Sequence, residues 1–200
     1  RQVHGHHCQI VEAPFDSHDP PAADALATTA TGLVLGVTTA DCAPILLADA
    51  EAGVIAAAHA GWRGARDGII EASVRAAKRL GAVPERLVAA IGPCIAQPSY
   101  EVGEVFKADF VLADARSEAF FSPGPAGRPH FDLEGYCALR LEATGVARVE
   151  RLGIDTFAAP ENYFSYRRTT KAGERHFGLQ VAAITLGAHP AESPSMSISR

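Results

Sequence analysis

The chain has 200 residues, of which 48% are hydrophobic and 20% are charged, and its formal net charge is −5. This length suits a single domain that buries a full core, and the composition is that of an ordinary globular protein. The acidic balance argues against nucleic acid or an anionic membrane as the main partner. No window approaches the roughly 20 uninterrupted apolar residues that a membrane-spanning helix requires.

The chain begins at Arg1 rather than at a methionine, and no signal-peptide pattern follows. We therefore expect a further N-terminal segment in the complete protein. Four cysteines without a CxxC pair are too few and too widely spaced for a disulfide scaffold. We expect reduced thiols in a cytoplasmic protein, at Cys8, Cys42, Cys94 and Cys137.

The N-terminal half alternates strand-like and helical patterns. Residues 1–31 begin as a strand and continue as a loop rich in Pro, Asp and Thr. Apolar runs then predict strands over 32–39, 43–48 and 54–58. Apolar residues at helical spacing predict a helix over 64–80, which Gly81 ends, and a short buried strand follows over 87–91.

The C-terminal half continues the irregular alternation. Residues 102–112 predict a second amphipathic helix, 122–130 a loop, and 133–143 a third helix capped by Asp132. The remaining stretches are a strand over 146–154, an irregular aromatic and basic segment over 157–175, a strand over 177–186 and a polar tail over 187–200. This pattern favours an α+β (mixed α/β) fold, with one domain over 1–186 in which mixed β-sheets are flanked by helices.

Cys42 and His59 are the most informative pair of residues. They lie at the two ends of the hairpin predicted from strands 43–48 and 54–58, so antiparallel pairing returns them to one edge of the sheet. Small residues flank His59, which favours an open pocket, and Cys42 lies at a strand break beside the carboxylate of Asp41. A thiolate beside an imidazole makes either a metal site or a nucleophile–base pair, and the residues alone leave both open.

His4 is the third candidate, because the small Gly5 beside it leaves room around the ring. One cysteine and two histidines give three protein ligands, as in many catalytic zinc sites, and copper is a competitor. A closed structural site in a non-enzymatic binding module needs a fourth protein ligand. The histidines available for that position are His6, His7 and His130.

Seven short motifs occur in one order along residues 1 to about 186: QVHG, GVTTADCAPILLAD, AAAHAGWRG, IGPCI, SYEVG, FDL and FSYRR. Together they resemble the YfiH-type laccase-domain family, also described as multicopper polyphenol oxidase-like proteins. The resemblance implies a YfiH-like fold and a metal site made of His4, Cys42 and His59, holding zinc or alternatively copper. Family members also carry a further segment before QVHG.

The resemblance implies a purine nucleoside phosphorylase that cleaves adenosine, inosine and methylthioadenosine, with adenosine deaminase activity beside it. The partners are then purine nucleosides and phosphate, with no nucleic acid and no membrane. A copper-dependent polyphenol oxidase is an alternative, although multicopper oxidases need several copper centres and this chain offers one three-ligand site. A metal-free hydrolase with Cys42 as nucleophile and His59 as base is another alternative.

The implied reactions nominate further residues. Deamination by a metal-activated water needs proton transfer, for which Asp41 is the candidate. Phosphorolysis needs cations for phosphate, and the candidates for an anion clamp are Arg63 and the Arg167–Arg168 pair, of which Arg168 is taken as catalytic. The aromatic residues available to stack on a purine are Trp62, Phe164 and Tyr166. Cys94 is expected to be a packed, inert thiol, and the oligomeric state is not readable from the sequence.

Overall fold

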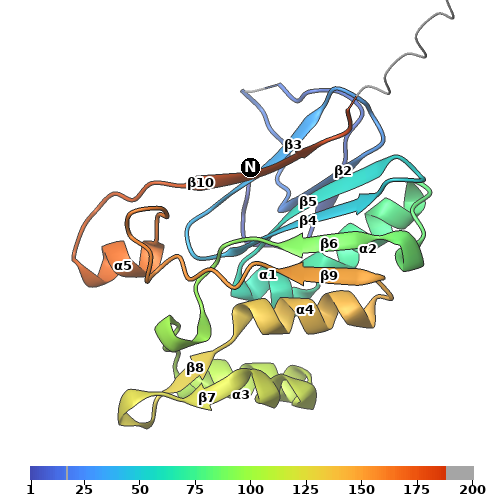
Figure 1. The fold of residues 1–200 in the computed structure, drawn as a ribbon. Coiled ribbons are helices and arrows are strands. Elements are labelled where there is room, and N and C mark those ends of the chain that lie inside the picture. Colours follow the sequence, from blue (N-terminus) through green and yellow to red (C-terminus); the bar gives the residue numbers. More distant parts are fainter. Residues whose placement is uncertain (17, 188–200) are drawn as a thin grey trace, which may run out of the picture.

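The structure is a computed structural model and describes residues 1–16 and 18–187. Its centre is a six-stranded sheet in the order β1-β2-β5-β4-β6-β9 (Figure 1). The middle strands are rich in Ala, Val and Ile, which suits a sheet covered on both faces. The strands of this sheet are β1 (Cys8–Ile10), β2 (Ala25–Thr28), β4 (Ala43–Asp49), β5 (Val54–Ala60), β6 (Val88–Ile91) and β9 (Arg148–Arg151).

Antiparallel pairing in the middle of the sheet gives way to parallel pairing at both edges. Strand β4 pairs antiparallel with β5 and β6, whereas β1–β2 and β6–β9 are parallel pairs. The β4–β5 register places Ala43 opposite Ala60 and Pro44 opposite His59. The predicted hairpin is therefore confirmed, and it returns Cys42 and His59 to one edge of the sheet.

Helices cover one face of this sheet (Figure 1). Helix α2 (Ile69–Arg79) packs on β5, and helix α4 (Leu133–Ala143) packs on β6 and β9. The side chain of Asp132 caps α4, as predicted, by accepting a hydrogen bond from the Gly135 N–H. The predicted apolar stripe of α2 is buried at Ile70, Val74 and Ala77.

The helix predicted over 64–80 is two helices in the structure. Helix α1 (Trp62–Asp67) ends and α2 begins at Gly68, whose φ is 104°. Glycine adopts this left-handed backbone conformation without a steric penalty. The break preserves the apolar spacing of the following turns, so the spacing alone predicted one continuous helix.

A two-stranded sheet covers the opposite face. Strand β3 (Val34–Thr39) pairs antiparallel with β10 (Gln180–Thr185) along their full lengths. A second, smaller core fills the space between this pair and the central sheet. Its buried members are Leu35, Val37, Ile55 and Ala57.

An aromatic cluster lies at the end of the molecule next to α4. Helix α3 (Glu104–Ala113) packs there with the short hairpin β7 (Phe121–Pro123) and β8 (Pro129–Phe131). Rings of these elements contact Trp62 and Tyr136, for example at 5.0 Å between the ring centroids of Trp62 and Phe106. Four short 3₁₀ turns complete the described fold: η1 (Pro84–Arg86), η2 (Gln97–Ser99), η3 (Ala115–Phe120) and η4 (Pro125–Gly127).

The mixed α/β architecture is confirmed, but three short stretches were predicted wrongly. Strand β2 lies inside the loop predicted within 1–31, and the hairpin β7–β8 overlaps the loop predicted over 122–130. Helix α5 (Tyr166–Lys171) lies inside the segment predicted to be irregular. Of the predicted tail, residues 188–200 lie outside the described residues. No helix in the described part of the chain is long and apolar enough to cross a membrane.

Candidate functional site

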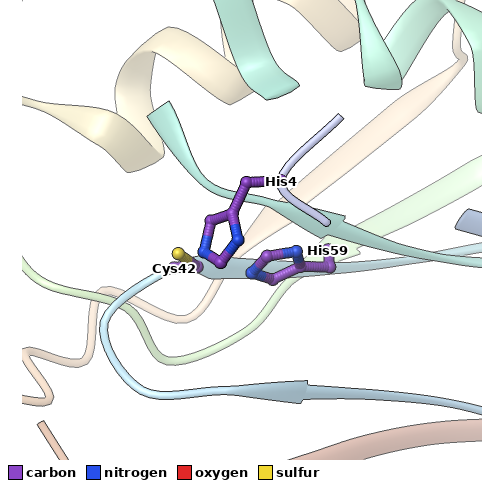
Figure 2. Close-up of side chains that lie close together, drawn as sticks. All are labelled: His4, Cys42 and His59. Carbon is purple, nitrogen blue, oxygen red and sulfur yellow. The ribbon is translucent and has the colours of Figure 1, made fainter. Parts of the chain in front are cut away.

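The structure brings His4, Cys42 and His59 together. Cys42 lies just before β4, His59 lies near the end of β5, and His4 reaches the pair from the N-terminal segment (Figure 2). One ligand atom from each side chain lies within 4.8 Å of the other two. The rings of His4 and His59 meet edge to face, with centroids 4.7 Å apart and an interplanar angle of 84°.

Asp24 is a buried carboxylate beside this group that the sequence analysis missed. It lies directly before β2 and is 1% exposed. Its Oδ1 lies 2.9 Å from Nδ1 of His59, so this nitrogen is assigned as the N–H donor and Nε2 keeps the lone pair. This arrangement of a carboxylate behind a histidine is common around metal ions.

Asp24 also holds the segment that carries His4. Its carboxylate accepts hydrogen bonds from the backbone N–H groups of Val3, His4 and Gly5. Burial alone raises the pKa of Asp24, but the hydrogen bonds from His59 and these N–H groups outweigh it and hold the pKa below its ordinary value. The carboxylate is therefore ionised in the native protein at neutral pH.

The pKa values of two candidate ligands are shifted in opposite directions. Burial, with the nearby charges of Asp41 and Asp24, raises the pKa of the Cys42 thiol to about 12. Partial burial and the neighbouring His59 lower the pKa of His4. His4 is thus ready to bind a metal in its neutral form, whereas the Cys42 thiol releases a proton as a metal binds.

The donor set fits a zinc ion. Two imidazole nitrogens and one thiol sulfur, all within 4.8 Å of one another, are donors of the kinds that zinc prefers. The backbone of Gly61 packs closely against two of the donor side chains. A Cβ atom at this position would lie 3.0 Å from Sγ of Cys42 and 3.1 Å from Cδ2 of His4. Only glycine leaves both donors undisturbed at this position.

A cavity of about 230 Å³ opens beside the three donors. His4 and Cys42 line it, together with Tyr100, Tyr166 and Arg167. A second cavity, of about 450 Å³, lies next to it and is lined by Glu101, Phe106 and Arg128, among others. Because the two cavities have wall residues in common, they are adjoining parts of one cleft; the shared residues are Trp62, Tyr100 and Arg167.

Asp41 lies at the cleft with both carboxylate oxygens engaged. Its Oδ1 accepts a hydrogen bond from the Thr156 hydroxyl at 2.7 Å, and its Oδ2 accepts one from the Arg167 backbone N–H at 2.6 Å. Its φ of 81° is unusual for a residue with a side chain, so local bonds must stabilise this conformation. The geometry makes Asp41 an anchor for the segment that contains Arg167.

The side chains of Arg167 and Arg168, predicted as one anion clamp, have different partners in the structure. Arg167 lines the cleft, lies 5.3 Å above the Tyr100 ring and donates one hydrogen bond to the Glu101 carbonyl. The guanidinium of Arg168 donates instead to backbone carbonyls and lines neither cavity of the cleft. These carbonyls belong to Thr156, Phe157 and Tyr163.

The other predicted residues fall into two groups. Trp62 and Tyr166 line the cleft, whereas Phe164 is 50% exposed and lines neither of its cavities. Arg63 is exposed and lies 4.9 Å above the Trp62 ring.

The closed four-ligand site gains no support. Within residues 1–16 and 18–187, the one group of His, Cys, Asp and Glu side chains that could share a metal is His4, Cys42 and His59. His130 instead bonds the Gln97 carbonyl through Nδ1, and His6 and His7 are exposed. Cys94 is buried, which raises the pKa of its thiol well above the ordinary value and accords with the inert role predicted for it.

The fold and site define a mixed α/β domain with a three-donor His–Cys–His group at the rim of a cleft. Residues 1–187 match the sequence profile of the family described as multi-copper polyphenol oxidoreductase laccase, and the chain belongs to this family. It is 40% identical over 172 residues to a purine nucleoside phosphorylase of Streptomyces coelicolor, covering 86% of this chain and 69% of that protein. It is 39% identical over 186 residues to a purine nucleoside phosphorylase of Rickettsia conorii, covering 92% and 76%.

Solved structures show the same fold. A Neisseria meningitidis protein, NMB0706, superposes with a TM-score of 0.81 and 29% identity, covering 94% of this chain and 73% of that one. A Bacillus licheniformis protein, YfiH, superposes with a TM-score of 0.79 and 25% identity, covering 92% and 72%. The predicted membership of the YfiH-type family is therefore confirmed.

Proposed function

We propose that this protein is a zinc-dependent purine nucleoside phosphorylase. The observation that carries the proposal is the pairing of a three-donor His–Cys–His group with an adjoining cleft that has aromatic walls and an arginine. Two relatives at about 40% identity bear the name of this activity. A reaction with a purine nucleoside and phosphate fits the cleft, because aromatic faces suit a base and a guanidinium suits an anion.

In phosphorolysis, an oxygen of phosphate forms a bond to the anomeric carbon of the ribose while the bond to the purine nitrogen breaks. The electron pair of the broken bond leaves with the purine, which takes up a proton. We assign the phosphate to Arg167, whose guanidinium is oriented by one bond to the Glu101 carbonyl and keeps further N–H groups for a ligand. Arg63 lines neither cavity but lies over the ring of Trp62, which does, so we keep it as a second candidate cation. Trp62, Tyr100 and Tyr166 form the walls for the base.

His4, Cys42 and His59 would hold the metal ion, which supplies Lewis acidity at the cleft when bound. Asp41 positions Arg167 through the backbone bond described above. Each carboxylate oxygen of Asp41 accepts one hydrogen bond and keeps a second lone pair, so a role in proton transfer is compatible with this geometry. Arg168 stabilises the segment around α5, so we assign the anion-binding part of the predicted pair to Arg167.

The substrates we propose are adenosine, inosine and methylthioadenosine, and adenosine deamination is a second reaction of the same cleft. A group of three protein donors, two of which (His4 and Cys42) line a cavity, leaves a coordination position for water or substrate, as in other catalytic zinc sites, and this favours deaminase activity. The four cysteines are free thiols in the structure, which supports a cytoplasmic location. A multicopper oxidase reaction is disfavoured, because the described residues hold one candidate metal group.

The test is to incubate the zinc-loaded protein with adenosine, with and without phosphate, and to identify the products by mass. We expect adenine and ribose 1-phosphate only when phosphate is present. Inosine in both incubations would identify the deaminase reaction. The absence of nucleoside turnover, together with bound copper and oxygen uptake on phenols, would contradict the proposal and favour the oxidase.

A further inference from the structure

We infer that Asp24 is a positioning residue that sets two of the three ligands of the proposed metal centre at once. A single carboxylate, 1% exposed, bonds Nδ1 of His59 and the backbone N–H groups on both sides of the His4 side chain. The inference rests on the proposed metal centre and is independent of the reaction that takes place there.

On one side, Asp24 fixes the ring of His59. The backbone N–H of His59 donates to the Asp24 carbonyl at 2.7 Å, and Nδ1 donates to Oδ1 at 2.9 Å. The first bond fixes the backbone of His59 relative to Asp24, and the second fixes the ring relative to the same residue. Rotation of the ring would therefore break its bond to the carboxylate. The proton on Nδ1 leaves Nε2 as the lone-pair atom, which is the form that binds a metal.

On the other side, Asp24 fixes the backbone that carries His4. Three successive N–H groups, of Val3, His4 and Gly5, converge on its two oxygens at 2.7 to 3.2 Å. Such a run of N–H groups forms a concave anion-binding site. The φ of His4 is 59°, a conformation that costs energy for a residue with a side chain. The carboxylate compensates for this cost.

Asparagine at this position has the same shape but cannot satisfy both sides. Oδ1 of Asp24 accepts from Nδ1 of His59 and from the His4 N–H, and Oδ2 accepts from the Gly5 N–H. Asparagine has one acceptor oxygen, so its NH₂ group faces the Gly5 N–H in one orientation, and Nδ1–H of His59 and the His4 N–H in the other. One ligand therefore loses its orientation. The N-terminal segment stays attached, because the Gln2 side chain bonds the backbone N–H and carbonyl of Thr38.

Asp49 provides a matched control. It is also a buried aspartate, and its carboxylate also accepts hydrogen bonds from backbone N–H groups, here those of Glu51, Ala52 and Val83. It lies at the turn of the β4–β5 hairpin, at the end opposite to Cys42 and His59. It contacts none of the three candidate ligands. Asp49→Asn therefore reports what the loss of a buried carboxylate does to the fold alone.

The experiment measures zinc affinity by competition with a chromophoric chelator for the wild type, Asp24→Asn and Asp49→Asn. We expect Asp24→Asn to bind zinc about 10- to 100-fold more weakly, and Asp49→Asn to bind it within twofold of the wild type. Equal affinity of Asp24→Asn and the wild type would overturn the inference. Failure of the wild type to bind zinc would overturn both the metal centre and this inference, whereas zinc binding without phosphorolysis would contradict only the proposed reaction.

A second measurement needs no variant that might unfold. In the metal-free wild type, ¹⁵N chemical shifts of the imidazole are expected to show His59 protonated on Nδ1, and the amides of residues 3–5 are expected to exchange slowly with deuterium. Protonation of His59 on Nε2, or fast exchange at these amides, would overturn the inference.

Discussion

A Cβ atom on Gly64 would lie 2.7 Å from the carbonyl oxygen of Gly5. The first turn of α1 and the segment that carries His4 therefore pack backbone against backbone, and only glycine permits this approach. We expect Gly64→Ala to push the segment outward and to weaken zinc binding by roughly 10-fold or more, as does the loss of other groups that orient metal ligands. Zinc affinity from chelator competition checks this.

The control for this variant is Gly36→Ala in β3, where a Cβ would meet the Val181 side chain at an ordinary 3.6 Å. This substitution is expected to leave zinc affinity unchanged. Equal zinc affinities of the two variants would show that the contact between Gly64 and Gly5 does not position His4.

Substitution of the candidate ligands is expected to separate metal binding from stability. His4→Ala removes an exposed ring, so we expect it to abolish zinc binding and turnover while it changes the stability of the metal-free protein by no more than about 0.5 kcal/mol. His59→Ala is also expected to abolish zinc binding and turnover. In addition, it is expected to destabilise the metal-free protein by about 1–3 kcal/mol, because Asp24 loses a buried hydrogen-bond partner. Metal analysis and urea unfolding measure the two effects, and bound zinc with full turnover in both variants would disprove the ligand assignment.

Removal of the metal tests the hydrolase alternative. Dialysis against a chelator is expected to abolish phosphorolysis, and added zinc is expected to restore it. A hydrolase that uses Cys42 as nucleophile and His59 as base would retain its activity without metal. The pKa of Cys42, raised to about 12, also disfavours a free thiolate nucleophile in the metal-free protein.

Alanine substitutions of Arg167 and Arg168 are expected to have different effects, the first on phosphate binding and the second on stability. Arg167→Ala removes the cation that lines the cleft, so we expect the KM for phosphate to rise by roughly 10- to 100-fold with little loss of stability. Arg168→Ala is expected to destabilise the protein by about 1–3 kcal/mol, because three carbonyls lose their donor. Phosphate kinetics and unfolding curves of both variants are the measurement, and a reversed pattern would return Arg168 to the anion site.

Asp49 is expected to make stability depend on pH under acidic conditions. Burial raises the pKa of Asp49, but hydrogen bonds from Val83 and Ala52 and the charge of Arg86 outweigh it and bring the pKa to about 2, from an ordinary 3.8. A pKa lowered in the folded state means that its stabilisation is complete above the ordinary value and is lost as the pH falls from about 4 to 2. The difference in unfolding free energy between the wild type and Asp49→Asn is therefore expected to shrink over this range, and a constant difference would contradict the shift.

The hairpin and the approach of its two candidate ligands could be predicted because the information is local. Two apolar runs around a turn fix the pairing, and the pairing fixes where Cys42 and His59 meet. The helix over 64–80 was predicted in the right place for the same reason. The break at Gly68 left its apolar stripe intact, so the pattern contained no sign of it.

The features that the sequence did not predict depend on contacts between distant segments or on the directions of side chains. Asp24 lies 35 residues from His59 in a stretch whose Pro and Asp content indicated a loop, and nothing in that stretch distinguishes this aspartate from its neighbours. Helix α5 has six residues, which is too short for its apolar spacing to be recognised. The different contacts of Arg167 and Arg168 follow from the direction of each side chain, which adjacent positions in the sequence do not specify.

The separations along the chain also indicate an order of folding. Cys42 and His59 are joined by one hairpin with a turn over residues 50–53, so their approach closes a short loop at a small entropic cost. The bond between Asp24 and His59 and the docking of residues 3–5 close longer loops and need strand β2 in place. During refolding, the pair of Cys42 and His59 is therefore expected to form before His4 docks, so a metal ion would meet two donors first and the third last.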